Sequence, residues 1–248
     1  MLDEAKTSAN DSAMNATKTH SAPRIITLAS SKGGVGKSTC SAALAGALAS
    51  REGAVTLIDL DVNGTLIRWY NKHGGKLPNI TVLQATPDTF HQLLTNATSS
   101  NSAYIIIDVA GAYEATMIKA IAESNLVITP AKLSEPDLRE AAKVFSEVEA
   151  LNKRFRATIQ YRLLVNEAET LNPMYQRHAL AEVDASALTR FTHLMNKRAA
   201  YREIFITGLP PHFADKGRGP IAKAVAELDD ILTEIVQILS EPTKAKAA

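Results

Sequence analysis

Short, nearly unbroken runs of apolar residues alternate with longer stretches of mixed polarity along most of the chain. Unbroken runs of this length are typical of parallel strands that helices cover on both faces. The pattern therefore predicts an α/β fold with a doubly wound, mostly parallel sheet and helices on both of its faces. The runs cover residues 25–29, 54–60, 80–83, 104–109, 126–129, 159–165 and 204–206.

Three stretches outside these runs have the apolar spacing of helices. Residues 38–50 are rich in alanine and leucine, and Ser134-Glu-Pro-Asp137 has the pattern of a capping box that starts a second helix. A third helix is expected from Pro220, with one apolar stripe and an acidic opposite face. The acidic face carries Glu227, Asp229, Asp230 and Glu234.

Composition and length favour one domain. The first 22 residues, rich in Ser, Thr, Asn and Ala, are expected to form a disordered tail, 23–240 one domain, and 241–248 a flexible tail. A single cysteine, Cys40, excludes a disulfide framework and a cysteine-built metal site within one chain. No run of 18 apolar residues and no secretion signal is present, so a cytoplasmic protein is expected.

A glycine-rich turn, S-K-G-G-V-G-K-S-T at residues 31–39, stands between the first apolar run and the first helix. This is the strand, loop and helix order of a phosphate-binding loop, in which glycines let backbone N–H groups point at phosphate oxygens. Lys37 would contact the β- and γ-phosphates, and the Ser38 hydroxyl would bind Mg²⁺. The predicted ATP contacts in the loop are Lys32, Gly33, Gly34, Val35, Gly36, Lys37, Ser38 and Thr39.

Carboxylates follow two of the expected strands. Asp59 and Asp61 end the run A-V-T-L-I-D-L-D, and Asp108 ends Y-I-I-I-D. Because the ligand sites of open α/β sheets lie at the carboxyl ends of the strands, Asp61 and Asp108 are candidates for work near the γ-phosphate. For Asp59, a local turn contact and a direct role are both open.

The loop K-G-G-V-G-K-S-T resembles the deviant phosphate loop of the ParA/MinD ATPases, and most of all the small partition ATPases without an N-terminal helix-turn-helix domain. The resemblance implies a P-loop NTPase fold, ATP and Mg²⁺ as cofactors, and a homodimer that forms with ATP. It also implies that Lys32, which precedes the regular loop lysine, reaches the nucleotide of the other subunit.

The same resemblance assigns roles to the carboxylates. L-I-D-L-D matches the switch I signature, in which Asp61 orients the attacking water, and Asp108 matches the Walker B aspartate. Lys32, Lys37 and Asp61 are then the catalytic set, while Ser38, Asp61 and Asp108 serve Mg²⁺. The chain has D-V-N-G where the family commonly has D-P-Q-G, and D-V-A-G where it has D-T-P-P. These departures leave the hydrolysis rate open.

Two residues are candidates for the adenine pocket. Asn166 follows the run Y-R-L-L-V, and relatives use an asparagine there to hydrogen-bond the base. Pro210 matches a region that lines the other side of the base. Alternatively, Asn166 is a turn residue and Pro210 ends a strand.

Basic residues are concentrated late in the chain. Residues 151–202 hold nine Lys or Arg and four Asp or Glu, a net charge of +5. The stretch N-K-R-A-A-Y-R-E-I-F has a helical pattern that places Arg198 and Arg202 on one face. Together with Lys153, Arg154 and Arg156, the candidates for non-specific DNA binding are Arg190, Lys197, Arg198 and Arg202. A solvated helix face is the alternative.

The favoured function is that of a ParA-like ATPase. It would dimerise with ATP, bind DNA non-specifically in the nucleoid, and hydrolyse ATP when a ParB-like partner stimulates it. A MinD-like membrane-cycling ATPase and a relaxosome or other cargo-positioning relative are alternatives. The acidic terminal helix argues against stable membrane association. A reductase like the nitrogenase iron protein is excluded because it needs paired cysteines.

Overall fold

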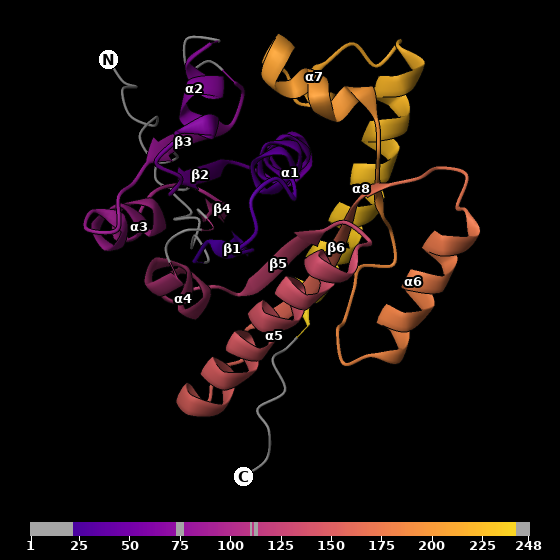
Figure 1. Ribbon diagram of the computed structural model, residues 1–248. Helices are drawn as coiled ribbons and strands as arrows, with labels where there is room; N and C mark the ends of the chain where they lie inside the picture. Colours follow the sequence, from indigo (N-terminus) through magenta and orange to yellow (C-terminus); the bar gives the residue numbers. More distant parts are fainter. Residues whose placement is uncertain (1–21, 73–76, 110, 112–113, 242–248) are drawn as a thin grey trace, which may run out of the picture.

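In the part of the chain that the structure describes, seven parallel strands form the central sheet, in the order β3-β2-β4-β1-β5-β6-β7 (Figure 1). The computed structural model describes residues 22–72, 77–109, 111 and 114–241. The strand order confirms the doubly wound parallel sheet. The strands are β1 (Arg24–Leu28), β2 (Val55–Asp59), β3 (Ile80–Gln84), β4 (Tyr104–Asp108), β5 (Leu126–Ala131), β6 (Gln160–Ala168) and β7 (Met195–Asn196).

Helices cover both faces of this sheet, as Figure 1 shows. One face packs against α1, α2, α7 and α8, and the other against α3, α4 and α5. The helices are α1 (Lys37–Arg51), α2 (Thr65–Asn71), α3 (Phe90–Thr98), α4 (Glu114–Ala122), α5 (Glu135–Phe155), α6 (Met174–Ala185), α7 (Ala199–Thr207) and α8 (Gly219–Ser240), with a 3₁₀ turn, η1 (Pro211–Phe213).

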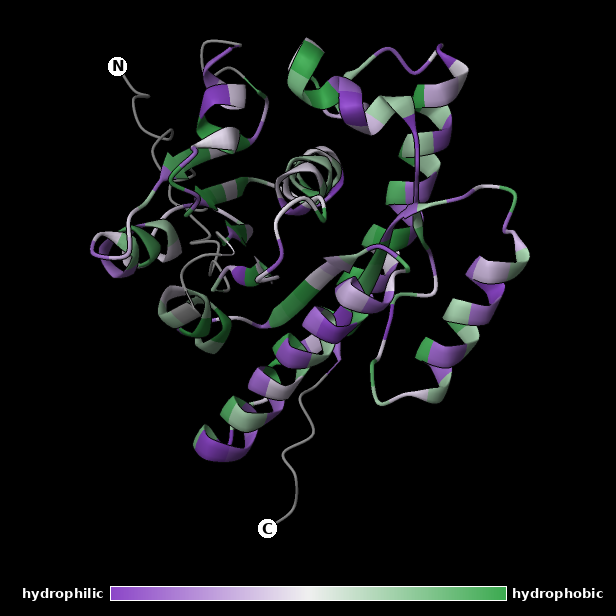
Figure 2. Cartoon of the chain, viewed as in Figure 1, coloured by the Kyte–Doolittle hydropathy of each residue, from purple (hydrophilic) through white to green (hydrophobic). Residues whose placement is uncertain are grey.

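Alternating side chains of the strands divide the hydrophobic core into two layers. In β4, Ile106 packs in the layer of α1 and α8, while Ile105 and Ile107 pack in the layer of α3 to α5. Because both faces are covered, β2 is buried throughout, which explains its unbroken apolar pattern. Figure 2 shows hydrophobic strands in the interior and polar turns on the outer side of α5.

The expected strand at residues 204–206 is wrong, because these residues lie in α7. A short apolar run does not distinguish a strand from a buried helix segment. The helical arrangement is set by Ala200, Tyr201 and Ile204, which are buried in the core, whereas Ile206 is exposed. The seventh strand is instead β7, whose two residues are too few to give a pattern.

Two carboxylates on the acidic side of α8 make contacts within the fold, although Asp230 on the same side is exposed. Glu227 is buried, and its carboxylate accepts hydrogen bonds from Asn196, Arg198 and the Tyr201 hydroxyl. Glu234 accepts from the backbone N–H groups of Thr192 and His193. These carboxylates therefore fasten α8 to the segment that carries β7 and α7.

The apolar stripe of α8 packs into the core, through Ile221, Leu228, Ile231 and Ile235. Among the described residues, no helix combines the length and the apolar character that crossing a membrane requires. The two expected tails, 1–22 and 241–248, lie outside the described residues except for Ala22 and Glu241.

Candidate functional site

The glycine-rich loop lies at the carboxyl edge of the sheet, between β1 and α1. β1 is flanked by β4 and β5, so the loop is close to the middle of that edge. Gly34 and Gly36 have φ angles of 75° and 94°, a left-handed backbone that favours glycine. Gly36 is the N-cap of α1, and no side chain of the described residues caps this helix. The first N–H groups of α1 therefore remain available to an anion.

The side chain of Asn166 contacts the phosphate loop and stabilises its backbone. It is buried at the bulged end of β6, and its side-chain amide donates a 2.8 Å hydrogen bond to the Val35 carbonyl oxygen. The approach is so close that a Cβ on Gly36 would lie 2.2 Å from Asn166 Nδ2. Asn166 thus fixes the loop conformation, and its contact with adenine stays a prediction.

Replacing Gly36 by alanine is expected to destabilise the protein without nucleotide. The added Cβ meets Asn166 and the residue must keep a positive φ, a strain of about 1–3 kcal/mol. Each kcal/mol corresponds to a fall of about 2–4 °C in the thermal unfolding midpoint of a domain of this size.

Gly33→Ala is the matched control for that measurement, because a Cβ there meets nothing within 4 Å and Gly33 has no positive φ. Thermal unfolding of the two variants without nucleotide compares them directly. Equal midpoints would contradict the bracing contact of Asn166.

The two loop lysines point in different directions. Lys37 Nζ donates a 3.0 Å hydrogen bond to the Lys32 carbonyl oxygen, so its amine lies across the loop. Burial lowers the pKa of Lys37, while Asp108 and Asp61 oppose this shift. Lys32 forms an ion pair with the buried carboxylate of Asp137 at the start of α5. Of the two lysines, only Lys37 lies over the loop of its own chain.

Asp137 is a residue of the site that sequence reasoning did not assign to it. Its carboxylate pairs with Lys32 and also accepts the Lys132 N–H at 3.1 Å. The expected N-cap is confirmed, since the Ser134 hydroxyl accepts the Asp137 N–H. The reciprocal bond of a capping box is not formed, because the Ser134 N–H donates to the Lys132 carbonyl oxygen instead. The neighbouring Ser31 hydroxyl donates to Glu140. The capping pattern gave no signal that the first turn of α5 meets the loop.

Ser38 and Asp108 form the part of the site that suits a metal ion. The Ser38 hydroxyl donates a 2.6 Å hydrogen bond to Asp108 Oδ2, and Asp108 Oδ1 is buried with no hydrogen-bond partner among the described residues. Burial is the main cause that raises the pKa of Asp108 to about 7. A hydroxyl beside a carboxylate with a free oxygen fits the oxygen ligands of Mg²⁺.

The two aspartates at the carboxyl end of β2, Asp59 and Asp61, have different surroundings. The buried Asp59 carboxylate accepts the N–H groups of Asp61, Leu66 and Ile67, which anchors the start of α2. Of the two roles left open for Asp59, the local turn contact is confirmed. Asp61 lies in the following turn, half-buried, and its Oδ1 accepts the Asn63 N–H at 2.9 Å. Asp61 is therefore the carboxylate that remains accessible.

Pro210 is buried against α1. A Cβ on Gly46 would lie 2.5 Å from Pro210 Cβ, so the glycine permits this close contact. Gly46 is nine residues beyond Lys37, or about 13 Å along the helix. Packing on α1 accounts for the burial of Pro210, and a contact with the base stays a prediction.

The candidate DNA residues do not form one surface. The backbone of Arg190 forms an isolated β-bridge with Leu163, in the first half of β6. Lys197 instead follows β7, which pairs with the far end of β6 at Ala168. Five strand residues separate the two positions, or about 17 Å. Lys153, Arg154 and Arg156 end α5 near the start of β6, at the opposite edge from the phosphate loop.

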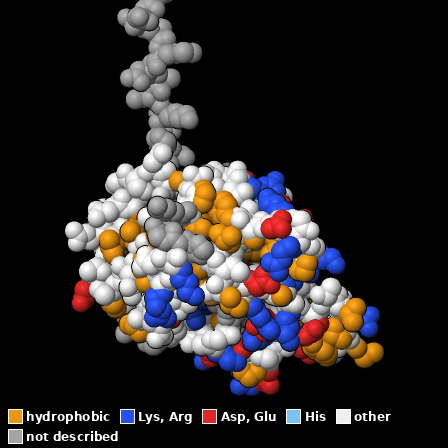
Figure 3. Space-filling view, turned by 90° about the horizontal axis from the view of Figure 1, so that it is seen from above, with side chains coloured by type: hydrophobic (Ala, Val, Ile, Leu, Met, Phe, Trp, Pro, Cys, Tyr) orange, Lys and Arg blue, Asp and Glu red, His pale blue; other side chains and the backbone are white. Residues whose placement is uncertain are grey.

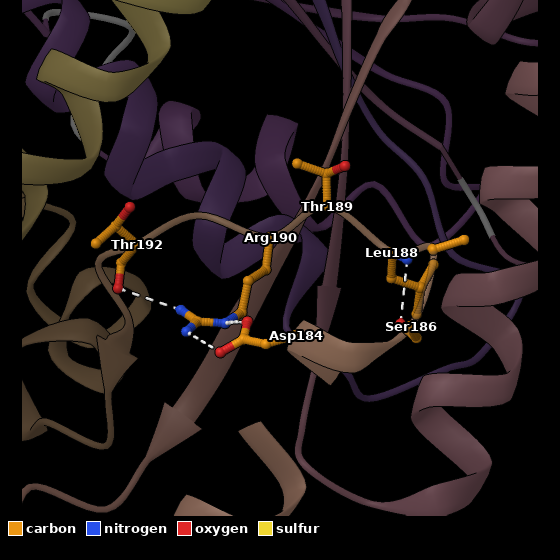
Figure 4. A pocket seen from close by; sticks show the side chains of 7 residues that line it. Asp184, Ser186, Leu188, Thr189, Arg190 and Thr192 are labelled. Carbon is orange, nitrogen blue, oxygen red and sulfur yellow. Dashed lines mark hydrogen bonds and ion pairs between the residues drawn. The ribbon is translucent and has the colours of Figure 1, made fainter. Parts of the chain in front are cut away.

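Two of these arginines, Arg190 and Arg198, already have acidic partners. Figure 4 shows the Arg190 guanidinium held by Asp184 and the Thr192 carbonyl oxygen. These residues line a pocket of about 360 Å³. Arg198 pairs with buried Glu227 at 2.9 Å. Arg198 is the N-cap of α7 with an extended backbone, so the prediction that it shares a helical face with Arg202 is wrong. Arg202 is exposed.

Comparisons with known proteins bear on this site. Residues 26–195 match the family described as CobQ/CobB/MinD/ParA nucleotide binding domain. The chain is 25% identical over 226 residues to the Protein ParA of Rhizobium radiobacter, covering 88% of this chain and 98% of that protein.

Two solved structures show the same fold. The MinD cell division protein of Aquifex aeolicus has a TM-score of 0.64 at 21% identity, covering 89% of this chain and 100% of the other. A putative plasmid partition protein of Borrelia burgdorferi, bound to AMPPNP, has a TM-score of 0.60 at 18% identity, covering 86% and 99%.

Proposed function

Because the chain belongs to the CobQ/CobB/MinD/ParA family of nucleotide-binding domains, we propose that it is a ParA-like ATPase that segregates or positions plasmid or chromosomal DNA. ATP joins two copies in a sandwich dimer that binds DNA non-specifically. A ParB-like centromere-binding or adaptor protein stimulates hydrolysis and releases the dimer. The protein acts in the cytoplasm and associates with the nucleoid when ATP is bound.

The observation that carries the proposal is the pair of lysines in one glycine-rich loop. Lys37 lies across its own loop, as a cation for the β- and γ-phosphates must. Lys32 instead contacts α5, away from the loop of its own chain. A lysine directed away from its own phosphate site is suited to serve the site of a second copy, where it neutralises charge on the transferred phosphoryl group.

The other residues divide the chemistry between them. The N–H groups of the loop and of α1 bind the phosphate oxygens. Ser38 and Asp108 would hold Mg²⁺, which neutralises charge on the β- and γ-phosphates when it is bound. Asp61 accepts a hydrogen bond from the attacking water and orients it, while Asp59 holds the turn that presents Asp61.

Dimer formation requires a rearrangement at Lys32. Its amine must leave Asp137 before it reaches the partner's nucleotide. Asp137 keeps the Lys132 N–H, so α5 retains part of its N-terminal bonding when the lysine leaves. The bound γ-phosphate is the competing anion, which couples closure of the dimer to the presence of ATP.

DNA binding is expected to depend on the exposed basic residues near the carboxyl edge. Lys197→Ala with Arg202→Ala should weaken ATP-dependent binding to unrelated duplexes and reduce its salt dependence, because each lost phosphate contact lowers the slope of log K against log salt by about 0.9. Fluorescence anisotropy with a labelled duplex in AMPPNP or ADP, over a salt series, gives both quantities. Arg198 is left intact because its loss would unpair the buried Glu227 carboxylate.

Arg154→Ala is the matched control for DNA binding, since Arg154 is also exposed but lies at the opposite edge of the sheet. It should bind as the unaltered protein does. An unchanged affinity and salt slope in the Lys197 and Arg202 double variant would refute this DNA surface.

A membrane-cycling ATPase is the second candidate, because the chain shares its fold with the MinD of Aquifex aeolicus. The burial of the apolar stripe of α8 weighs against it, since this stripe is not available to a lipid surface. Co-sedimentation with anionic vesicles in AMPPNP tests the two candidates against each other. Recruitment to vesicles without binding to DNA would favour the membrane function.

A further inference from the structure

Most of the exposed large hydrophobic side chains in the described part of the chain follow the carboxyl ends of strands. Among the described residues there are six, and four of them follow the carboxyl ends of strands: Val62 after β2, and Leu171, Met174 and Tyr175 after β6. Leu171 is 95% exposed, and Met174 and Tyr175 are 76% and 60% exposed. Figure 3 shows hydrophobic side chains gathered at the right, the side on which α6 lies in Figure 1. We call Leu171, Met174 and Tyr175 the apolar cluster.

The loop that presents the apolar cluster has a defined internal structure. Gln176 is buried, and its side chain exchanges hydrogen bonds of 2.8 and 3.0 Å with the backbone of Glu169. Asn172 closes the turn with its N–H to the Glu169 carbonyl oxygen and adopts a positive φ of 47°. Leu171 is thus held outward by the fold. Pre-organised apolar residues of this kind are typical of binding surfaces because little ordering remains to be done on association.

The apolar cluster and Val62 flank the phosphate loop on opposite sides. The loop follows β1, and both β2 and β6 lie two strands away from β1 in the sheet. With about 4.8 Å between neighbouring strands, the ends of β2 and β6 are about 19 Å apart, and the phosphate loop follows the strand midway between them. A face with apolar contacts on both sides of a central site is suited to a two-fold axis, because each copy offers the same patches to the other.

The charges beside the apolar cluster favour a protein partner over a polyanion. Glu167 pairs with Lys132 at 3.0 Å, and Glu169 pairs with Lys197 at 3.8 Å. These two pairs carry no net charge, and exposed Arg177 on α6 adds a single positive charge beside the apolar cluster, so the rim is close to neutral. Nucleic acid and anionic membranes are bound by surfaces with excess positive charge. An apolar centre with a charge-balanced rim is the usual anatomy of a protein interface.

We propose that the apolar cluster is a contact surface for a second copy of this chain, formed when ATP brings the two phosphate loops face to face. The inference rests on the proposed ATP-dependent dimer and adds the side chains that hold it together. Lys32 and the nucleotide supply the charged centre of the interface. Leu171, Met174 and Tyr175 supply its apolar flank, with Val62 of each copy at the other flank.

The test is the dimerisation of a Leu171→Ser/Met174→Ser double variant, measured by sedimentation velocity over a concentration series in AMPPNP. Both side chains are exposed, so the fold does not depend on them. The dissociation constant of the dimer is expected to rise at least about tenfold, while the affinity for ADP stays unchanged. Phe155→Ser is the matched control, because Phe155 is 61% exposed at the opposite end of α5. It should dimerise as the unaltered protein does.

A second readout is the reaction of Leu171→Cys with a maleimide. Cys40 is fully buried and burial raises the pKa of its thiol, so the introduced cysteine dominates the signal. The reaction should slow in AMPPNP relative to ADP, whereas that of Phe155→Cys should not. A double variant that dimerises normally, with Leu171→Cys unprotected, would overturn the apolar cluster but leave the proposed dimer intact. Unaltered protein that stays monomeric in AMPPNP would overturn both.

Discussion

Replacing Lys37 by alanine is expected to abolish useful ATP binding, with a loss of affinity of about 100-fold. The Lys37 amine is the one side-chain cation that lies across the phosphate loop within the described part of this chain. Charge-assisted hydrogen bonds contribute about 1.5–3 kcal/mol each, and 1.4 kcal/mol corresponds to a factor of ten. Titration calorimetry with ATP and Mg²⁺ measures the change.

Lys32→Ala is the matched control, since it removes the same charge from the same loop. Its side chain contacts Asp137, so nucleotide affinity of the single chain should be nearly unchanged. The two lysines would thereby be separated, one for binding and one for dimerisation. Unaltered ATP affinity in Lys37→Ala would remove the basis for the loop assignment.

Asp61→Ala is expected to retain ATP binding and the dimer while turnover falls at least about 100-fold. Positioned acid–base groups contribute about 10²–10⁴ in rate, and Asp61 is the accessible carboxylate of the turn after β2. Phosphate release under saturating ATP measures the rate, and sedimentation in AMPPNP measures the dimer. An unchanged hydrolysis rate would refute the role of Asp61.

Asp59→Ala provides the contrast for Asp61. It removes the acceptor of three backbone N–H groups at the start of α2, so it should lower the thermal unfolding midpoint as well as the activity. Asp61→Ala should leave that midpoint nearly unchanged. Comparing the two variants distinguishes Asp59, whose carboxylate stabilises the turn, from Asp61, whose carboxylate acts in hydrolysis.

The phosphate loop and the sheet were predictable because their signals are local in the sequence. The glycines with positive φ, the following lysine and hydroxyl, and the apolar run before them all lie within residues 25–39. Likewise, the Ser134 cap spans four residues and was predicted correctly. Each of these features follows from the conformational preferences of a few neighbouring residues.

The contacts that arrange the site join residues far apart in the sequence, and no local pattern reports them. Lys32 and Asp137 are separated by 105 positions, and Asn166 lies 131 positions from the Val35 carbonyl that it braces. A lysine and an aspartate are common surface residues, so their pairing becomes apparent only when α5 is placed beside the loop. The hydrogen bond from Asn166 to the Val35 carbonyl oxygen is therefore seen only in the folded structure and does not follow from sequence similarity.

Charge patterns were the least informative part of the sequence. The acidic side of α8 and the basic residues near β7 belong to separate segments of the sequence, yet Glu227 and Arg198 form a largely buried pair. Tertiary contacts decide which charges remain free. Exposed Arg202 therefore carries the DNA hypothesis together with Lys197, whose ion pair with Glu169 is exposed and 3.8 Å long, while Arg190 is held by Asp184.

The central claim is that each site is completed by Lys32 of the other copy, and a mixing experiment tests it most directly. Lys32→Ala lacks the lysine given to the partner, and Asp61→Ala lacks the carboxylate of its own site, so each alone should be inactive. Mixed dimers contain one site with its own Asp61 and a Lys32 from the partner. The account predicts that an equal mixture regains part of the ATPase rate. A mixture as inactive as its two components would contradict it.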